Sequence, residues 1–400
     1  MTTAATDATS QEQPAAGCRL VEPADAAELA RELAAAASAG LAVVPRGGGT
    51  KSDWANAPPR ADMILSTRRL DRVLEHAAGD MTATVEAGCT IADLQKLLAL
   101  RGQRLAIDPL WEARATVGGV LATNDNGTLR GAYGGLRDLI IGVTVALADG
   151  TLARSGGKVV KNVAGYDLPK LMVGAFGTLG VITRATFRLH PLPQATRTFA
   201  FSSPTPQDAA RLVLAVQDST LAPAAVQFVA TSAGKMTIAV RVEGSAGGIE
   251  TAAERLHGLA ARHGATSFDC AEDTWMEREQ LWDGRDVICK ATFLPSRIAD
   301  VCGALRRCAG EWKLVAQAVG VGLLGIRPSQ PHDIPATVSA IRRELEELGG
   351  SLVVLRCPPD VTERLDVWGD VGATLALMRR VKQQLDPGRV LNPGRFVGGI

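Results

Sequence analysis

The sequence predicts an α+β protein of two domains, the second of which holds a mainly antiparallel sheet. Three glycine clusters, at 45–51, 115–122 and 174–182, punctuate the first half of the chain. The run His190-Pro191-Leu192-Pro193 then interrupts regular structure and indicates a domain boundary. Beyond it, strand-like runs alternate with helical stretches, as in an α+β domain. We therefore expect a disordered tail at 1–18, domains at 19–193 and 194–385, and a turn-rich tail at 386–400.

Local signals predict the elements of the first domain. Asp25 and Glu28 form a capping-box pattern for a helix that ends at Gly40. Thr90 is placed to cap a second helix, which ends near Gly102. Asp149-Gly150 is a turn signal between two apolar runs and predicts a hairpin. The expected strands are 41–44, 63–66, 82–86, 139–147, 151–154 and 181–189, a short helix is expected at the second glycine cluster, and 167–174 is expected to be helical.

The second domain is predicted from alternating patterns of hydrophobic residues. A mainly antiparallel sheet follows from many short strands that are separated by helices on one chain segment. The tail from Asp386 to Gly394 is rich in turn residues and ends the last helix. The expected strands are 197–202, 225–230, 236–243, 289–294, 314–325 and 351–356, and the expected helices are 206–218, 248–263, 296–307, 335–348 and 373–385.

Composition excludes several classes of function. A net charge of +1 over 400 residues gives no electrostatic basis for binding nucleic acid. No apolar run is long enough for a membrane span, and no signal peptide is recognisable, so we expect a cytoplasmic protein. The seven cysteines include no Cys-x-x-Cys pair, so neither a disulfide framework, a structural zinc nor an iron–sulfur cluster is indicated. No metal ligands are predicted.

The most informative stretch runs from Val44 to Lys51, where a strand feeds three consecutive glycines. Glycines leave backbone N–H groups uncovered, and such groups can curl around an anion. Arg46 and Lys51 would add positive charge at the two edges, so the loop has the chemistry of a pyrophosphate cradle. A plain surface turn is the alternative for a glycine triplet alone. A nicotinamide site is not favoured, because the loop runs on into Asn-Ala-Pro-Pro instead of opening a helix.

Six motifs in order resemble the FAD-linked oxidoreductases of the vanillyl-alcohol oxidase type. The resemblance covers 19–193 and the tail closely and the middle loosely. Within this family, the combination most resembles the FAD-binding subunits of bacterial glycolate oxidases. The motifs are Pro45–Thr50, Ala115–Gly119, Tyr133–Asp138, Lys161–Leu168, Gly177–Ile182 and Leu391–Gly394.

The resemblance implies an FAD-binding domain of two subdomains, an α+β cap domain, a tail at 386–400 that returns to the FAD-binding domain, and a role for each matching residue. The first glycine loop would hold the FAD pyrophosphate, the second cluster would line the flavin and its ribityl chain, and the third would lie along the nucleotide. The implied cofactor-binding residues are Pro45, Arg46, Gly47, Gly48, Gly49, Thr50 and Lys51; Pro109, Thr116, Gly118 and Gly119; Gly134, Asp138, Gly180, Val181 and Ile182; and Asn392, which would approach the flavin ring.

Departures from the family pattern bear on mechanism. Some relatives attach FAD through a His or Cys near these loops; here the loops carry neither, so FAD is expected to be non-covalent. The larger catalytic relatives carry a His-x-Gly-Asp-Gly-Asn-x-His segment in the cap, but the corresponding stretch, Val319–Ile326, has no His. No catalytic residue is therefore assigned. Leu281–Arg285 resembles a cap segment whose Arg faces the substrate carboxylate, so Arg285 is a candidate substrate-binding residue; a helix-surface Arg is the alternative.

These observations lead to three hypotheses about function. The first is an FAD-binding subunit of a multi-subunit glycolate (2-hydroxy-acid) oxidase or dehydrogenase. It would work beside a larger catalytic flavoprotein and an iron–sulfur subunit, in the cytoplasm or peripherally at the inner membrane through that complex. The second is a self-contained FAD-dependent D-2-hydroxy-acid dehydrogenase that resembles D-lactate dehydrogenases. The third is a non-catalytic scaffold that keeps FAD only to hold a complex together.

Overall fold

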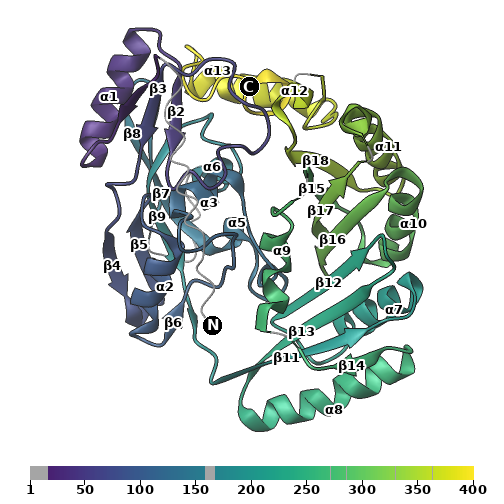
Figure 1. Cartoon of the computed structure of the whole chain (residues 1–400). Helices are drawn as coiled ribbons and strands as arrows, with labels where there is room; N and C mark the ends of the chain where they lie inside the picture. The colour runs from purple at the N-terminus through teal and green to yellow at the C-terminus, as the bar shows by residue number, and fades with distance from the viewer. Residues whose placement is uncertain (1–16, 158–166, 271, 285, 329, 363) are drawn as a thin grey trace, which may run out of the picture.

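The computed structural model describes residues 17–157 and 167–400, except 271, 285, 329 and 363. Two units lie side by side and are built on separate sheets (Figure 1). The first unit occupies the N-terminal half, and the second carries a large sheet with its helices on the outer face. Both helices and antiparallel sheets are present, which confirms the predicted α+β class. The predicted Lys161–Leu168 motif lies almost entirely outside the described residues.

Two main sheets form the first unit. The smaller sheet is parallel, in the order β1-β3-β2, and helix α1 packs its apolar side against it. The larger sheet is antiparallel, in the order β4-β5-β9-β7-β8. A two-stranded ribbon, β6 with β10, stands beside it. The strands are β1 (Arg19–Val21), β2 (Val43–Arg46), β3 (Met63–Ser66), β4 (Val73–Ala77), β5 (Thr82–Glu86), β6 (Gln103–Arg104), β7 (Ile140–Ala146), β8 (Leu152–Gly156), β9 (Val181–Arg188) and β10 (His190–Pro191).

The helices of the first unit begin where their caps predict. The Asp25 side chain accepts a hydrogen bond from Glu28 N, and that of Thr90 accepts one from Asp93 N. Gly40 follows the first helix with a positive φ. The helices are α1 (Ala26–Ser38), α2 (Ile91–Ala99), α3 (Val117–Thr123), α4 (Arg130–Tyr133), α5 (Leu136–Leu139) and α6 (Leu168–Met172).

The second unit is one eight-stranded antiparallel sheet, in the order β14-β11-β13-β12-β16-β17-β15-β18. Its strands are β11 (Ala195–Ser202), β12 (Ala225–Thr231), β13 (Met236–Gly244), β14 (Thr266–Phe268), β15 (Val287–Thr292), β16 (Glu311–Gln317), β17 (Val321–Arg327) and β18 (Ser351–Arg356). Its helices, with the tail helix, are α7 (Pro206–Gln217), α8 (Ala246–Arg262), α9 (Glu277–Gln280), α10 (Ile298–Cys308), α11 (Ile334–Glu347), α12 (Pro359–Thr362) and α13 (Thr374–Leu385). Short 3₁₀ turns lie at Ala78–Asp80, Glu272–Met276, Pro295–Arg297, Pro331–Asp333 and Val397–Gly399.

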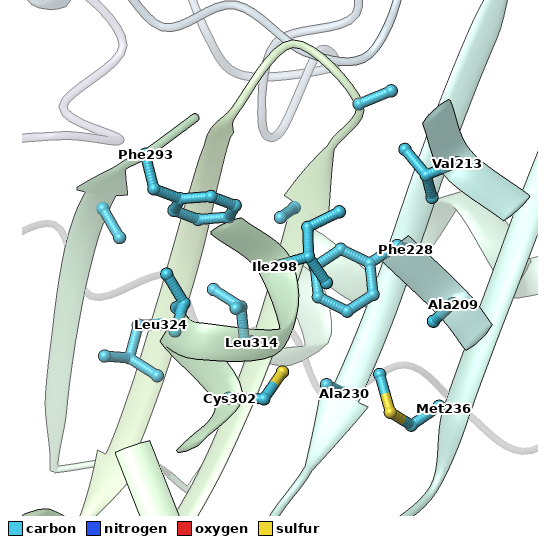
Figure 2. Packing of buried hydrophobic residues seen from close by; sticks show 14 of the residues in the cluster. Ala209, Val213, Phe228, Ala230, Met236, Phe293, Ile298, Cys302, Leu314 and Leu324 are labelled. Atoms are coloured by element: carbon cyan, nitrogen blue, oxygen red, sulfur yellow. The ribbon is translucent and has the colours of Figure 1, made fainter. Parts of the chain in front are cut away.

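The two faces of this sheet contribute to two separate hydrophobic clusters. On the outer face, α7, α8, α10 and α11 cover the main apolar core. Figure 2 shows Ile298 and Cys302 of α10 among Phe228 and Leu314 of the strands beneath. The inner face packs side chains such as Val315 against the first unit, through a cluster rich in tryptophan. The period-two alternation of a strand therefore sends successive residues to two separate cores.

Several sequence expectations need correction. The run at 314–325 is not one strand but the hairpin β16–β17, because the chain turns at Gly320, where φ is +78°. The strand expected at 41–44 lies at Val43–Arg46. Strands β1, β4, β6, β10 and β14 were not predicted. Strands β1, β6, β10 and β14 have two or three residues each and pair with strands remote in sequence, whereas β4 pairs with its neighbour β5. Among the described helices, none is long and apolar enough to cross a membrane.

Candidate functional site

A pocket lies where the first glycine loop, α3 and the C-terminal tail meet. It contains about 850 Å³ of empty space, part of it open to solvent. Segments more than 300 residues apart in sequence are brought together here, as the motif order implied. The predicted residues that line it are Pro45, Arg46, Gly47, Gly48, Gly49, Thr50, Lys51, Thr116, Gly118, Gly119, Gly180, Val181, Ile182 and Asn392.

The first glycine loop leaves β2 and passes close to the segment before α3. A Cβ on Gly48 would lie 1.9 Å from the carbonyl oxygen of Arg114, and one on Gly47 would lie 2.1 Å from Thr116 Oγ1. No side chain therefore fits at either position. The backbone N–H groups of Gly48, Gly49 and Thr50 donate no hydrogen bond to any described residue. This loop offers free donors to an anion, as a phosphate cradle requires.

Helix α3 is fixed against the end of β5. The Gly118 N–H donates to the carbonyl of Ala87 at 2.8 Å, and Thr116 Oγ1 accepts from Gly119 N at 3.3 Å. Cys89 lies in the same region and is buried. Burial raises the pKa of its thiol to about 11, so the thiolate needed for covalent chemistry is disfavoured.

The two cations of the loop lie in different environments. Arg46 lines the pocket and makes no ion pair with a described residue. Lys51 is 6% exposed, and its ammonium pairs with Asp125 Oδ2 at 3.2 Å, between the rings of Trp54 and Trp111. Both residues line the pocket, so a role of their positive charges at the loop edges stays a prediction. The ammonium of Lys51 already has a carboxylate partner in Asp125.

The C-terminal tail closes the pocket from the other side. Asn392 N donates to Val43 O at 2.9 Å, and its Nδ2 donates to Phe176 O at 2.7 Å. Its Oδ1 is buried and has no hydrogen-bond partner among the residues that the structure describes, so the side chain has an acceptor left for a ligand. Arg395, which sequence reasoning missed, donates to three carbonyls at Lys51, Ser52 and Trp54 and holds the loop in place. The only sequence signal for Arg395 was its position directly after the Leu391–Gly394 motif.

Four predicted residues lie outside this pocket or outside the described chain. Pro109 is buried beside Leu110, whose carbonyl accepts from Lys51. The Asp138 carboxylate accepts from Gly135 N at 2.8 Å and caps α5, and Gly134 precedes that turn with a φ of +86°. These three positions have structural explanations within the fold. Arg285 falls outside the described residues.

Two family matches coincide with the walls of the pocket. The FAD binding domain family matches residues 19–156, which contain the glycine loop and α3. The C-terminal domain family of FAD-linked oxidases matches residues 370–396, which contain Asn392 and Arg395. The chain is an FAD-linked oxidoreductase. Its relatives place it with the glycolate oxidase and D-lactate dehydrogenase type.

The relatives extend over nearly the whole of this oxidoreductase. Glycolate oxidase subunit GlcD of Bacillus subtilis is 27% identical over 94% of this chain and 88% of its own length. D-lactate dehydrogenase of Archaeoglobus fulgidus is 28% identical over 94% of this chain and 91% of its own. A solved structure of alkyldihydroxyacetonephosphate synthase shares the fold, with a TM-score of 0.72, 18% identity, and coverage of 94% of this chain and 77% of that one.

The pocket residues fit FAD. The free N–H groups after Gly47 and the unpaired Arg46 suit its pyrophosphate, and the unsatisfied Asn392 Oδ1 offers an acceptor to a polar edge. When bound, FAD supplies the two-electron acceptor for the oxidation of a substrate. The described residues would contribute the cradle, the tail beside it, and an apolar wall from Phe176.

Proposed function

We propose that this chain is the FAD-binding subunit of a multi-subunit glycolate, or related 2-hydroxy-acid, oxidase. The observation that carries this proposal is an FAD pocket combined with a cap strand that lacks histidine. Strand β17 faces the first unit through Leu323, and the segment Val319–Ile326 contains no His. Oxidation at an α-carbon needs a group that takes the hydroxyl proton. A larger catalytic flavoprotein would supply that group, and an iron–sulfur subunit would receive the electrons.

The cofactor is proposed to be held without a covalent bond. The loop Gly47–Lys51 contains neither His nor Cys, and Cys89, which precedes the second glycine cluster, is buried with a raised thiol pKa. The chain is proposed to act in the cytoplasm, with peripheral contact to the inner membrane only through its complex. Arg285 is proposed to bind a substrate carboxylate.

A self-contained D-2-hydroxy-acid dehydrogenase is the second candidate. It is favoured by the relative named D-lactate dehydrogenase, which this chain matches over 91% of that protein's length. In that case a base other than histidine would serve the substrate hydroxyl. A scaffold that binds FAD without using it is the third candidate.

Purification of the chain alone separates these candidates. We expect a yellow protein that releases all of its flavin on acid precipitation and turns over glycolate negligibly with an artificial electron acceptor. Loss of a general base typically lowers a rate by about 10²–10⁴-fold, so slight activity is compatible with the proposal. Turnover should appear when the larger flavoprotein and the iron–sulfur subunit are added, and a complex assembled without this chain is the control.

Each alternative has its own signature in the same experiment. Robust turnover by the lone chain would overturn the accessory role and identify a self-contained dehydrogenase. A yellow chain whose flavin is never reduced, even within an active complex, would identify a scaffold. Flavin that stays with the acid-precipitated chain would contradict non-covalent binding.

A further inference from the structure

The first glycine loop continues directly into a segment that is bound to the second unit. In this segment, residues 51–55, Trp54 stacks on Trp282 of the second unit, with ring centroids 5.4 Å apart and an angle of 5° between the planes. The N–H of Ala55 donates to the carbonyl of Leu355, in β18, at 2.8 Å. One short stretch of chain therefore faces the cofactor pocket at its start and the second unit at its end.

Three buried charges connect the same loop to helix α9, which lies between the two units (Figure 1). Asp125 follows α3, and its carboxylate is shared: Oδ2 lies 3.2 Å from Lys51 Nζ, and Oδ1 lies 3.2 Å from Arg278 Nη2. The exposed fractions of Lys51, Asp125 and Arg278 are 6%, 5% and 7%. Charges that are shielded from water interact more strongly and are screened less by salt, so a shift of Arg278 affects Lys51 through the shared carboxylate.

Arg278 also contacts the backbone around this carboxylate. Its Nη1 donates to the carbonyl of Asp108 at 2.9 Å, and Leu110 N donates to Asp125 Oδ2 at 2.9 Å. The Lys51 ammonium in turn contacts the Leu110 carbonyl at 3.4 Å. The position of Lys51 is thus set by the first unit through Leu110 and by the second unit through Arg278.

This anchoring bears on cofactor binding because the cradle itself is made of glycine. Glycine loses more conformational freedom on ordering than any other residue, so part of the cost of binding a ligand there is the cost of holding the loop still. A contact that fixes the end of the loop beforehand removes part of that cost. Neither Asp125 nor Arg278 lines the cofactor pocket, so they would act on FAD through the loop.

We propose that FAD and the second unit bind the glycine loop cooperatively, and that Arg278 is the positioning residue that couples them through Asp125 and Lys51. Docking of α9 orders the cradle before FAD arrives. Bound FAD in turn strengthens the contact between the units, since coupling between two binding events is reciprocal. The inference concerns cofactor loading, and it holds whether the chain is an accessory subunit or a self-contained dehydrogenase.

Flavin fluorescence titration of the full-length apoprotein tests the effect of the second unit on FAD. Arg278→Met should weaken FAD binding by about tenfold, within the range typical of coupled sites. Lys51→Met should weaken it too, and the double variant should bind little more weakly than Lys51→Met alone, because both side chains act along one path. Arg342→Met is the matched control. This partly buried arginine of α11 donates to Leu352 O at 3.1 Å within the second unit, and its loss should leave the FAD affinity unchanged.

Hydrogen exchange tests the reciprocal effect and needs no variant. Addition of FAD to the wild-type chain should slow amide exchange in a peptide spanning 275–284, which contains α9, and should leave peptides of α11 unchanged. In Arg278→Met the slowing at α9 should be lost. Unchanged exchange at α9, wild-type FAD affinity of Arg278→Met, additive losses in the double variant, or an equal loss in Arg342→Met would each overturn the inference.

Discussion

At the scale of single residues, Gly48 tests the cofactor cradle most directly. Gly48→Ala places a Cβ 1.9 Å from the Arg114 carbonyl, so the loop must move and its N–H groups must turn. We expect the variant to purify with little FAD while it keeps its circular dichroism spectrum. Gly79→Ala, where a Cβ meets nothing within 4 Å, is the control and should keep its flavin. Full flavin content in Gly48→Ala would place the cradle elsewhere.

The sequence identified the glycine loop but not the contacts that each of its side chains makes. Consecutive glycines identify Gly47–Gly49 because backbone exposure is a local property. Lys51 could not be assigned in this way, since its partner Asp125 is 74 positions away and nothing local marks their pairing. The sequence shows which residues carry charge or expose their backbone, but it does not show which distant residues they contact in the fold.

At the scale of elements, helix α13 fastens the tail to the cofactor pocket. Lys382 Nζ donates to Thr178 O at 2.7 Å, Asp386 Oδ2 at 2.6 Å and Leu391 O at 2.9 Å. Asp386 is fully buried and also accepts from Leu391 N at 2.8 Å. One helical residue thus ties the third glycine cluster to the strand-like tail that carries Asn392.

Replacing Lys382 with Met should therefore destabilise the protein and weaken FAD binding together. Removal of one partner of a buried pair leaves an uncompensated charge on Asp386 and costs about 3–5 kcal/mol. Urea unfolding measures the first effect and flavin fluorescence titration the second. Lys96→Met breaks an exposed pair with Asp93 and should change stability by less than about 1 kcal/mol. Equal stability of the two variants would show that the tail is held by other contacts.

Elements with local signals were predicted best. Helix starts at Asp25 and Thr90 agree with the structure because a cap is satisfied within four residues. Edge strands such as β14 were missed, since three residues carry too little periodicity to stand out. The β16–β17 turn was also missed, because both strands are apolar and Gly320 is the only turn-forming residue among the three, 318–320, that separate them.

At the scale of the whole molecule, one buried cluster joins the two units. Arg104 of β6 pairs with Glu243 of β13, and Tyr133 of α4 donates to the same carboxylate at 2.7 Å. The exposed fractions of the Arg104 and Glu243 side chains are 13% and 7%. Although burial acts in the opposite direction, hydrogen bonds from Arg104 and Tyr133 hold the pKa of Glu243 below its usual value. The Arg104–Glu243 pair therefore contributes to the free energy of unfolding above about pH 4.5, and this contribution is lost as the pH falls below that value.

Breaking this cluster should uncouple the units. Arg104→Met removes the guanidinium that pairs with Glu243 and leaves Tyr133 as the hydrogen-bond partner of that buried carboxylate among the described residues. We expect a loss of about 3–5 kcal/mol in the contact between the two units. Calorimetry should then resolve two unfolding transitions where the wild type shows one, with the wild-type transition splitting in the same way below about pH 4.5. Arg197→Met, which breaks the exposed pair with Glu250, should leave one transition. A single transition in Arg104→Met at neutral pH would mean that the tryptophan-rich interface alone makes the units cooperative, because its apolar contacts survive the substitution.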